Sequence, residues 1–269
     1  MHVASGSHAA LHVATYNIHK GFSQFNRRMM VHELRDRLRQ LAPDIVFLQE
    51  VQGLHLGHAE THSDWPEQSQ HAFLADQVWE NTAYGRNVVH DHGHHGNAIL
   101  SRFPILMTHN QDVTQLRFER RGLLHCVIDA GHRTDQVHCV CVHLSLFGRS
   151  RRKQMEALAE RLEDWIPSDA PLIIAGDFND WRNRADNLLI ERLGLTEVFG
   201  GAKDGLGLPP RSFPSTLPLF RLDRIYVRGF SVERTEVHFG APWSRISDHA
   251  ALSAHLVPNS HGRRANPVP

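Results

Sequence analysis

The residues whose types and spacing best suit chemistry lie in the stretch LIIAGDFNDW at 172–181. Its apolar, β-branched start predicts a short buried strand that Gly176 interrupts. Asp177 and Asn179 follow two positions apart, and an extended backbone directs residues at i and i+2 to the same side. A carboxylate and an amide that converge at a strand end suit a hard cation or a phosphoryl oxygen, although Asp-x-Asn also forms ordinary turns.

Other polar side chains also follow apolar runs. Glu50 ends IVFLQE, where a carboxylate is either at the surface or, if buried, paired or bound to a cation. His143 ends CVH, and a lone histidine there is more often a satisfied core residue than a catalyst. In SDHAAL, the adjacent Asp248 and His249 point to opposite faces of an extended chain. A different acid must therefore orient His249, and Asp223 in FRLDRIYV is the candidate.

The elements that must position these side chains follow from hydrophobic periodicity. Apolar runs predict strands at 11–18, 45–48, 83–90, 97–101, 104–113, 122–130, 136–144, 172–176, 221–228, 232–239 and 249–256. Helical spacing predicts helices at 27–41, from about Pro66, at 151–166 and at 184–193. This order favours the α/β class, as a four-layer sandwich of two mixed β-sheets packed face to face with helices outside. The polar residues would then gather in strand-end loops on one rim.

Length and composition favour one domain at 11–257, with flexible termini at 1–10 and 258–269. Lys plus Arg and Asp plus Glu both number 29, so the formal charge is 29 − 29 = 0, which argues weakly against a protein that simply coats nucleic acid. Three cysteines are too few for a disulfide framework or a four-ligand zinc site, and we interpret Cys139 and Cys141 as buried thiols. With no secretory-signal pattern and no membrane-spanning run, we expect a soluble, cytoplasmic monomer without stable membrane insertion.

Three further groups have both a structural and a functional interpretation. The histidine-rich stretches 55–62 and 92–95 could hold zinc, but their glycines indicate loops and no Cys or Glu completes a zinc motif. The basic runs 117–121 and 149–153 are either solvated turns or a rim that grips a substrate phosphate. Four aromatic residues either pack in the core, which we favour, or stack on bases or line a lipid groove: Phe147, Phe178, Trp181 and Phe220.

Seven segments in a fixed order identify a family. TYNIHKG, PDIVFLQEV, GNAILSRFP, VHLSL, AGDFND, RLDRIYV and SDHAAL together resemble the endonuclease/exonuclease/phosphatase superfamily, over about Ala14 to Leu256. Its members include deoxyribonucleases, abasic-site endonucleases, tyrosyl-DNA phosphodiesterases, sphingomyelinases and inositol polyphosphate phosphatases. YNIHKGF is most similar to a bacterial subgroup of unassigned substrate. The resemblance implies a phosphoester-hydrolysing enzyme.

The resemblance also implies a metal centre. Glu50 matches the family's main Mg²⁺ ligand, with Asn17 and Asp248 nearby as direct or water-mediated ligands. Oxygen ligands without a thiolate suit Mg²⁺, and Mn²⁺ is expected to substitute. Several DNA-repair relatives have an acid two residues after the first Asn, where this chain has His19, which weakens an abasic-site activity and a second carboxylate-rich metal site.

By the same matching, five residues carry the chemistry. Asp177 resembles the residue that orients or deprotonates the attacking water, and Asn179 and His143 resemble donors to phosphate oxygens. His249, oriented by Asp223, resembles the imidazole that stabilises the transition state or assists the leaving group. Hydrolysis of a phosphodiester requires an aligned nucleophile and donors where negative charge develops.

The substrate stays open between several classes. Nucleic acid is the first expectation, from the frequency of nucleases in the family and from the two Arg groups. A phospholipid head group or a small phosphoester is the alternative, which the zero net charge favours. A member that binds phosphate-bearing partners without cleaving them is the rival from outside the enzymes, although a pure binder does not need a water-activating acid. Fold-level similarity does not distinguish these substrates.

Overall fold

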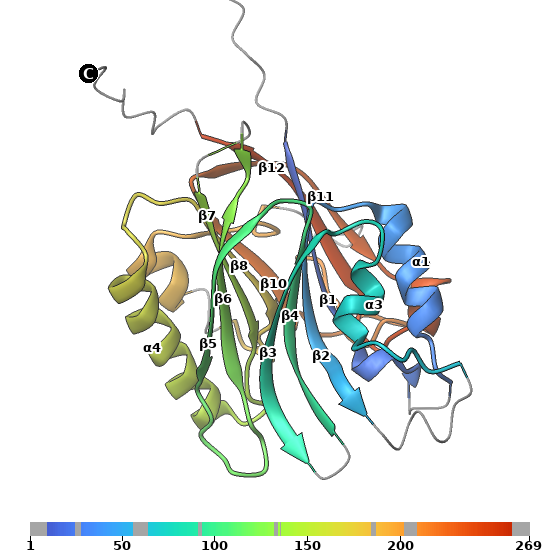
Figure 1. Ribbon diagram of the computed structural model, residues 1–269. Helices are drawn as coiled ribbons and strands as arrows, with labels where there is room; N and C mark the ends of the chain where they lie inside the picture. Colours follow the sequence, from blue (N-terminus) through green and yellow to red (C-terminus); the bar gives the residue numbers. More distant parts are fainter. Residues whose placement is uncertain are drawn as a thin grey trace, which may run out of the picture.

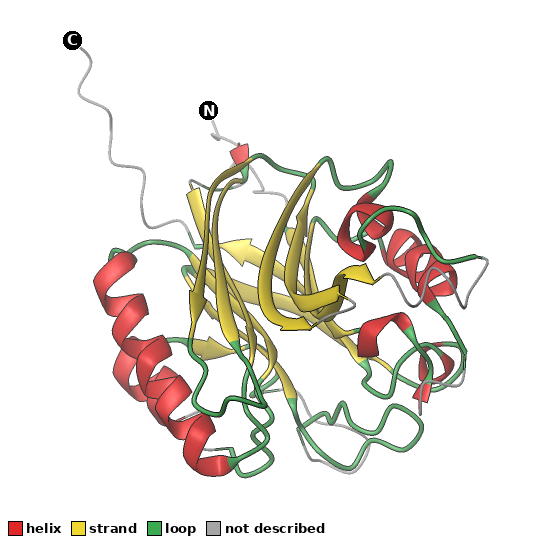
Figure 2. Cartoon of the chain, turned by 60° about the horizontal axis from the view of Figure 1, so that its bottom comes forward, coloured by secondary structure: helices red, strands yellow, loops and turns green. Residues whose placement is uncertain are grey.

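The computed structural model describes residues 10–24, 28–55, 64–90, 93–131, 134, 136–183, 187–201 and 209–259. Two six-stranded mixed β-sheets pack face to face (Figure 1, Figure 2). Helices α1 and α3 lie outside one sheet, and α4 lies outside the other (Figure 1). The predicted four-layer α/β sandwich is therefore confirmed.

The first sheet has the strand order β11-β12-β1-β2-β4-β3. Its strands are β1 Leu11–Asn17, β2 Ile45–His55, β3 Asn81–His90, β4 Gly93–Ser101, β11 Phe230–His238 and β12 Ala251–Pro258. Only β1 and β2 run parallel in this sheet, so Asn17 at the end of β1 lies beside the part of β2 that carries Glu50. The antiparallel pairing of β1 with β12 brings the start of β12, which follows Asp248 and His249, to that same edge.

The second sheet has the order β5-β6-β7-β8-β10-β9. Its strands are β5 Ile105–Asp112, β6 Gly122–Asp129, β7 Gln136–His143, β8 Leu172–Asp177, β9 Thr196–Glu197 and β10 Asp223–Arg228. β7 and β8 are parallel, and their register places His143 beside Asp177. β10 runs antiparallel on the other side of β8 and places Asp223 opposite Asp177.

Within the described ranges, three α-helices cover the sheets, and short helical turns lie in the loops. The α-helices are α1 Val31–Leu41, α3 Gln70–Ala75 and α4 Gly148–Trp165. The shorter elements are the 3-10 turns η1 His19–Gly21 and η5 Trp243–Arg245 and the π-helix η4 Asn187–Arg192. α4 packs its buried face, which includes Met155, Leu158 and Leu162, on the second sheet. Among the described residues, no helix is long and apolar enough to cross a bilayer.

The main core lies between the two sheets. Ile45 and Phe47 from β2 are fully buried there with Ile173 from β8. The predicted buried thiols are confirmed, because Cys139 and Cys141 lie in this core as free cysteines. In strands such as β2 and β8, alternating side chains face either this core or the outer helices, which is how the middle of each sheet is buried on both faces.

Several element boundaries differ from the predictions. β2 continues to His55 through a β-bulge between Leu48 and Val51, although the sequence pattern predicts a loop from residue 51. α1 begins only at Val31, and α3 ends at Ala75, before the predicted apolar residues Val78 and Trp79. β9 was not predicted, because two residues carry no periodicity. His58, His62 and His92 lie outside the described residues. The predicted flexible termini do so too, except for Ala10, Pro258 and Asn259.

Candidate active site

The predicted site residues meet at one end of the sandwich, here called the catalytic end. β1, β2, β7 and β8 finish there, and β10 and β12 begin there. In Figure 1 this is the lower end of the strands, and Figure 2 turns it toward the viewer. Strand ends from both sheets thus supply side chains to one region, as the sequence analysis expects.

Asp177 lies at the centre of the site. Its side chain is almost fully buried, and its Oδ2 is 3.1 Å from Asn17 Nδ2. The same oxygen lies 3.6 Å from His143 Nε2 and 3.8 Å from His249 Nε2. Burial raises the pKa of Asp177 to about 6; the positive charge of His249 opposes this rise, and the negative charge of Asp223 adds to it. One carboxylate therefore joins residues that are more than two hundred positions apart in the chain.

Asp223 and His249 form a buried pair. Asp223 Oδ2 lies 2.8 Å from His249 Nδ1, which leaves Nε2 of the imidazole facing Asp177. Burial alone would lower the pKa of His249, but the carboxylates of Asp223, Asp177 and Asp248 outweigh it and raise the pKa to about 10. His249 is therefore protonated at neutral pH. The structure places Asp223, not the adjacent Asp248, against its Nδ1.

Glu50 reaches the site through an unusual backbone conformation. It lies in the β-bulge of β2 with φ 57°, in the left-handed region that non-glycine residues rarely adopt. Its Oε1 accepts a hydrogen bond of 3.4 Å from Asn17 Nδ2, the atom that also donates to Asp177. The bulge thus turns a carboxylate out of the regular strand pattern and toward the other acids, at a conformational cost of about 1–3 kcal/mol.

Asn17 and Asp248 complete this side of the site. Asn17 Oδ1 accepts from the backbone N–H of His19 at 3.1 Å, so its amide nitrogen faces the carboxylates. Asp248 Oδ1 is 3.4 Å from His19 Nδ1, and both side chains are partly exposed. His19, at the position where some DNA-repair relatives have an acid, therefore faces a carboxylate with its imidazole.

Asn179 and His143 lie on the second-sheet side. Asn179 adopts φ 50°, and its Nδ2 donates to the Leu144 carbonyl at 2.9 Å. Its backbone N–H donates to Asp177 Oδ1 at 2.9 Å, so the turn after β8 also orients the central carboxylate. Burial, followed by the charges of Arg121 and His249, holds the pKa of His143 well below its usual value, so this imidazole is neutral.

The donor set fits a divalent cation. Four carboxylates from Glu50, Asp177, Asp223 and Asp248 converge here, and Asp223 Oδ1 is a buried oxygen with no hydrogen-bond partner in the described structure. Asp177, Asp223 and His249 have ligand atoms within 4.8 Å of one another, which is close enough to hold a metal. However, a protonated His249 has no lone pair for a metal, so at neutral pH this trio suits a hydrogen-bonded network better than a ligand set.

Serine hydroxyls support the site, although the sequence analysis did not single them out. Ser247 Oγ donates to the Asn17 carbonyl at 2.7 Å and accepts from the His249 backbone N–H at 3.3 Å. Ser212 Oγ accepts from the Asp223 backbone N–H at 3.1 Å. Ser247 immediately precedes the Asp-His pair in SDHAAL, which is the signal that could have found it.

A buried polar network holds the loop after His143. Glu119 is buried and accepts hydrogen bonds from Ser145 Oγ and, at 3.0 Å, from the Leu146 backbone N–H. Arg151 Nη1 donates to the Ser145 and Leu146 carbonyls at 2.9 and 3.0 Å. The predicted basic runs therefore have divided roles, because Arg151 is buried and structural whereas Arg117, Arg120 and Arg149 are exposed.

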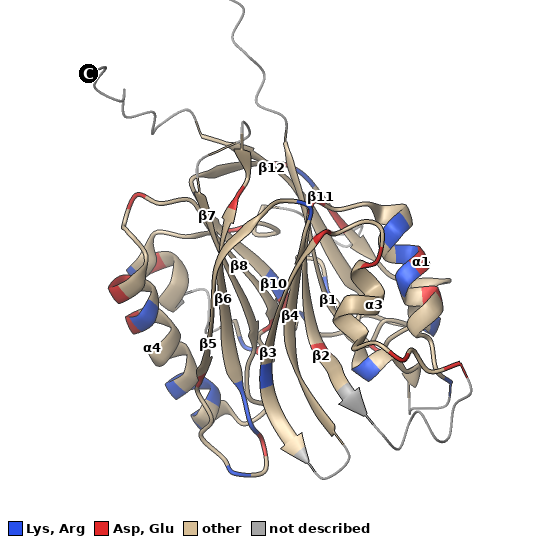
Figure 3. Ribbon diagram, in the orientation of Figure 1, with Lys and Arg blue, Asp and Glu red and all other residues tan. Residues whose placement is uncertain are grey.

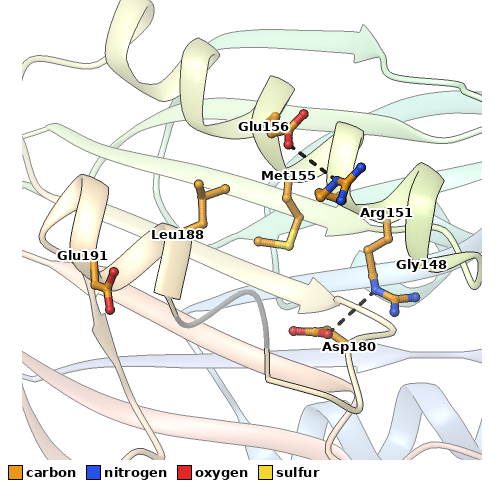
Figure 4. A pocket seen from close by; sticks show the side chains of 8 residues that line it. Gly148, Arg151, Met155, Glu156, Asp180, Leu188 and Glu191 are labelled. Atoms are coloured by element: carbon orange, nitrogen blue, oxygen red, sulfur yellow. Dashed lines mark ion pairs between the residues drawn. The ribbon is translucent and has the colours of Figure 1, made fainter.

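A pocket of about 360 Å³ adjoins the site between α4 and η4. Figure 4 shows Arg151 and Asp180 pointing toward one another across it, with Arg151 Nε and Asp180 Oδ1 3.9 Å apart. Met155 and Leu188 supply apolar walls. None of the predicted catalytic residues lines this pocket, and it touches the site only through Asp180, which follows Asn179.

Of the four aromatic residues near the motifs, one is buried and three are exposed. Only Phe178 is buried, where it packs against Tyr226. Core packing was the favoured interpretation for all four, but Phe147, Trp181 and Phe220 are 50%, 45% and 46% exposed. These three lie beyond the strand ends, outside the two sheets that enclose the main core.

The whole of this arrangement lies within a segment that matches one protein family. Residues 14–249 match the model of the Endonuclease/Exonuclease/phosphatase family, so the chain belongs to this family. The family recognised from the seven motifs is thereby confirmed. Its members are generally enzymes that hydrolyse phosphoesters and that depend on a metal.

The similar proteins do not indicate which substrate this chain acts on. The chain is 46% identical over 244 residues to the uncharacterized protein YbhP of Escherichia coli K12, and the match covers 91% of this chain and 95% of that protein. An endonuclease/exonuclease/phosphatase from Beutenbergia cavernae is similar in structure, with a TM-score of 0.71, 20% identity and coverage of 93% of this chain and 72% of that one. A mannosyl-6-phosphatase from Bacteroides thetaiotaomicron has a TM-score of 0.68, 17% identity and coverage of 92% and 99%. At these identities the two solved structures support the fold alone.

Proposed function

We propose that the chain is a metal-dependent phosphoesterase that hydrolyses phosphodiester bonds by in-line attack of water. The position of Asp177 carries this proposal. Its Oδ2 faces Asn17 on one side and two imidazoles, His143 and His249, on the other. A base, a cation and neutral donors around one point are what phosphoester hydrolysis requires.

Asp177 orients the attacking water and accepts its proton. A pKa raised to about 6 leaves this carboxylate ionised at neutral pH and more basic than an exposed aspartate, which is favourable for a general base. The hydrogen bonds from Asn17 and from the Asn179 backbone hold its two oxygens in fixed directions. Mobility of the base is thus restricted before the substrate binds.

His143 and Asn179 donate to the phosphate oxygens. The neutral imidazole of His143 has one N–H to donate, and the Asn179 amide has a second N–H besides the one that binds the Leu144 carbonyl. Donors that the fold already positions stabilise the charge that develops in the transition state.

His249, held by Asp223, acts at the leaving group or the pentavalent centre. A protonated imidazole with Nδ1 bound to a carboxylate presents Nε2–H, which can donate a hydrogen bond or a proton to the departing oxygen. The buried Asp223 fixes the ring and keeps it charged. Its role resembles that of an orienting carboxylate in other catalytic pairs.

Glu50 and Asp248 would hold the cation, which we propose to be Mg²⁺ with Mn²⁺ as a substitute. Asn17 would contribute through its Oδ1 only, directly or by way of a water, because its amide nitrogen donates to the Glu50 and Asp177 carboxylates. Such an ion supplies charge neutralisation at the phosphoryl oxygen and lowers the pKa of bound water. Oxygen donors suit it. Glu50 is the main ligand in this proposal, because the bulge of β2 turns its carboxylate toward the other acids in spite of the conformational cost.

Two substrate classes have specific support. Nucleic acid is favoured by exposed arginines at the catalytic end, Arg117 and Arg120 in the 113–121 loop and Arg149 in the first turn of α4. A phospholipid head group is favoured by the exposed apolar side chains of the same loops, among them Phe147. Both classes contain a phosphodiester, so both are compatible with the same chemistry.

Hydrolysis of bis-p-nitrophenyl phosphate tests the proposed function. We expect turnover with Mg²⁺ or Mn²⁺, loss of turnover with a chelator, and recovery when the metal is restored. An absence of turnover with every metal would overturn the proposal and favour a phosphate-binding protein without catalysis.

A further inference from the structure

Exposed apolar side chains are concentrated at the catalytic end. Thirteen large hydrophobic residues are exposed among the described residues, and eight of them lie in loops at this end: Phe118, Leu146, Phe147, Trp181, Leu217, Leu219, Phe220 and Phe239. Single exposed apolar residues are normal, but a group around a charged site is not. The catalytic end therefore has a surface feature that phosphoester chemistry alone does not explain.

Six of these residues form two lips that flank Asp177. The first lip extends from β7 and the neighbouring 113–121 loop, and it carries Phe118, Leu146 and Phe147, with the Phe118 and Phe147 rings edge to face at 5.8 Å. The second lip precedes β10 and carries Leu217, Leu219 and Phe220. Because β8 lies between β7 and β10, the lips are separated by two strand spacings, about 10 Å, with the end of β8 between them.

Buried hydrogen bonds anchor both lips to the site. Glu119 and Arg151 hold the backbone of the first lip, as described above. In the second lip, Ser215 Oγ donates to the Ser247 carbonyl at 2.6 Å, and the Ser215 N–H donates to the Asp248 carbonyl at 2.7 Å. The Phe213 ring lies 4.9 Å from the His249 ring. The exposed side chains are thus held by the same network that holds the catalytic residues.

The charge of the lips is positive. Arg117, Arg120 and Arg149 are exposed beside the first lip, and Figure 3 shows basic residues on the loop between β5 and β6 and at the lower end of α4. Within 116–121, 144–149 and 213–222 the only acidic residue is Glu119, which is buried. Apolar side chains with flanking arginines complement a surface that is apolar inside and anionic outside.

We propose that the two lips dock the catalytic end on an anionic phospholipid bilayer, with the lip side chains in the head-group region and the phosphodiester of a lipid head group at Asp177. The two most exposed residues of the group are Phe118 at 77% and Leu217 at 67%, one on each lip. Half of the lip residues are leucines, which have no aromatic face for a nucleobase but enter the acyl boundary readily. This inference rests on the proposed function and chooses the phospholipid head group from its two substrate classes.

Sedimentation with vesicles in the presence of a chelator tests docking without turnover. We expect the wild type to bind vesicles of phosphatidylcholine mixed with phosphatidylglycerol more strongly than phosphatidylcholine alone. A Leu217→Ser, Leu219→Ser variant should bind the mixed vesicles about tenfold or more weakly. Its matched control is Leu106→Ser with Met107→Ser, which removes exposed apolar side chains of β5 at the opposite end and should bind like the wild type.

Three results would overturn the docking proposal: no sedimentation of the wild type, equal binding by the lip variant, or equal loss in the control. A wild type that ignores vesicles but binds a single-stranded oligonucleotide, with that binding lost in the lip variant, would assign the lips to nucleic acid instead. An Arg117→Gln, Arg120→Gln variant provides a second measurement, because it should weaken binding to the mixed vesicles and leave binding to phosphatidylcholine alone unchanged. Since no step requires hydrolysis, docking and the proposed hydrolase activity can fail separately.

Discussion

The catalytic end and the opposite end of the sandwich are built from the same strands but from different kinds of residue. At the opposite end the strands start with apolar residues such as Leu11 and Ile45, both fully buried. Toward the catalytic end, β1 finishes in the buried Asn17 and β2 carries the half-buried Glu50 in its bulge. In these two strands, one end thus contributes packing and the other contributes chemistry.

Backbone conformation follows the same division. Seven non-glycine residues have positive φ among those described, and five of them lie at the catalytic end: His19, Lys20, Glu50, Asn179 and Asn183. Such conformations cost free energy and persist where the surrounding structure holds them. Buried carboxylates there add a further cost. The core therefore stabilises an end that is arranged for function at the expense of stability.

An Asp177→Asn variant should give the largest effect in this comparison. We expect turnover to fall by about two or more orders of magnitude, because the amide cannot accept a proton from water. Burial raises the pKa of Asp177 to about 6, so its ionised form is unfavourable in the fold and the neutral amide should leave the melting temperature equal or higher.

A core variant of the opposite end is the control. Ile45→Ala in β2 should lower the free energy of unfolding by about 2–5 kcal/mol, because it opens a cavity between the sheets, and should retain turnover per folded molecule. Steady-state kinetics and thermal melts distinguish the two. If Asp177→Asn kept near-wild-type turnover, the central role of this carboxylate would be wrong.

Metal affinity should separate the proposed metal ligands from the residues that act on the phosphate. Glu50→Gln should weaken Mn²⁺ binding by about tenfold or more, since a charged ligand is lost. His249→Ala should leave Mn²⁺ affinity within a few-fold and lower the turnover number more than it changes KM, because a protonated imidazole acts on the reacting phosphate. Calorimetric titration with Mn²⁺ measures both variants. Unchanged affinity in Glu50→Gln, with a loss in His249→Ala, would assign the ion to the Asp177, Asp223 and His249 trio.

The smallest expected effect is on the pH dependence of stability, to which buried histidines contribute. Burial lowers the pKa of His12 and His125 from 6.5 to about 4, whereas the carboxylates around His249 raise its pKa to about 10. The unfolded chain therefore binds more protons at His12 and His125 between pH 6.5 and 4, so their contribution to stability is present above pH 6.5 and lost as the pH falls through this range.

The contribution of His249 to stability changes with pH in the opposite direction. It is fully present below pH 6.5 and is lost as the pH rises through about 10. Thermal melts of the chelated protein should show a decline toward pH 4 that a His125→Gln variant reduces and a His249→Gln variant does not. A decline that is identical in wild type and His125→Gln would contradict the buried, neutral state of His125.

Much of the fold was predictable because strand and helix periodicity is a local property. Strands such as β8 and β7 were predicted within one residue of their bounds. The pairing of His249 with Asp223 was also predicted, although Asp248 and His249 lie in the bend before β12 and not in the extended strand that the prediction assumed. The bulge at Glu50 was not, because it depends on how β4 pairs with β2 beyond Leu48.

The exposure of the lips was not predictable either. Phenylalanine is typical of cores, but Phe147 and Phe220 lie beyond the strand ends and outside the core between the sheets, which leaves them exposed. The role of Glu119 was equally hidden, since a lone acid within a basic run carries no signal of burial or of partners near residue 145.

By itself, the sequence determined which residue types stand at which strand ends, and therefore the family and the chemistry that these residues can perform. Only the tertiary structure decided that Asn17, Asp177 and His249 meet, since sheet order and register bring together positions that local patterns cannot relate. It also decided which side chains remain exposed. Periodicity reports the face of an element, whereas exposure depends on what the rest of the chain places against that face.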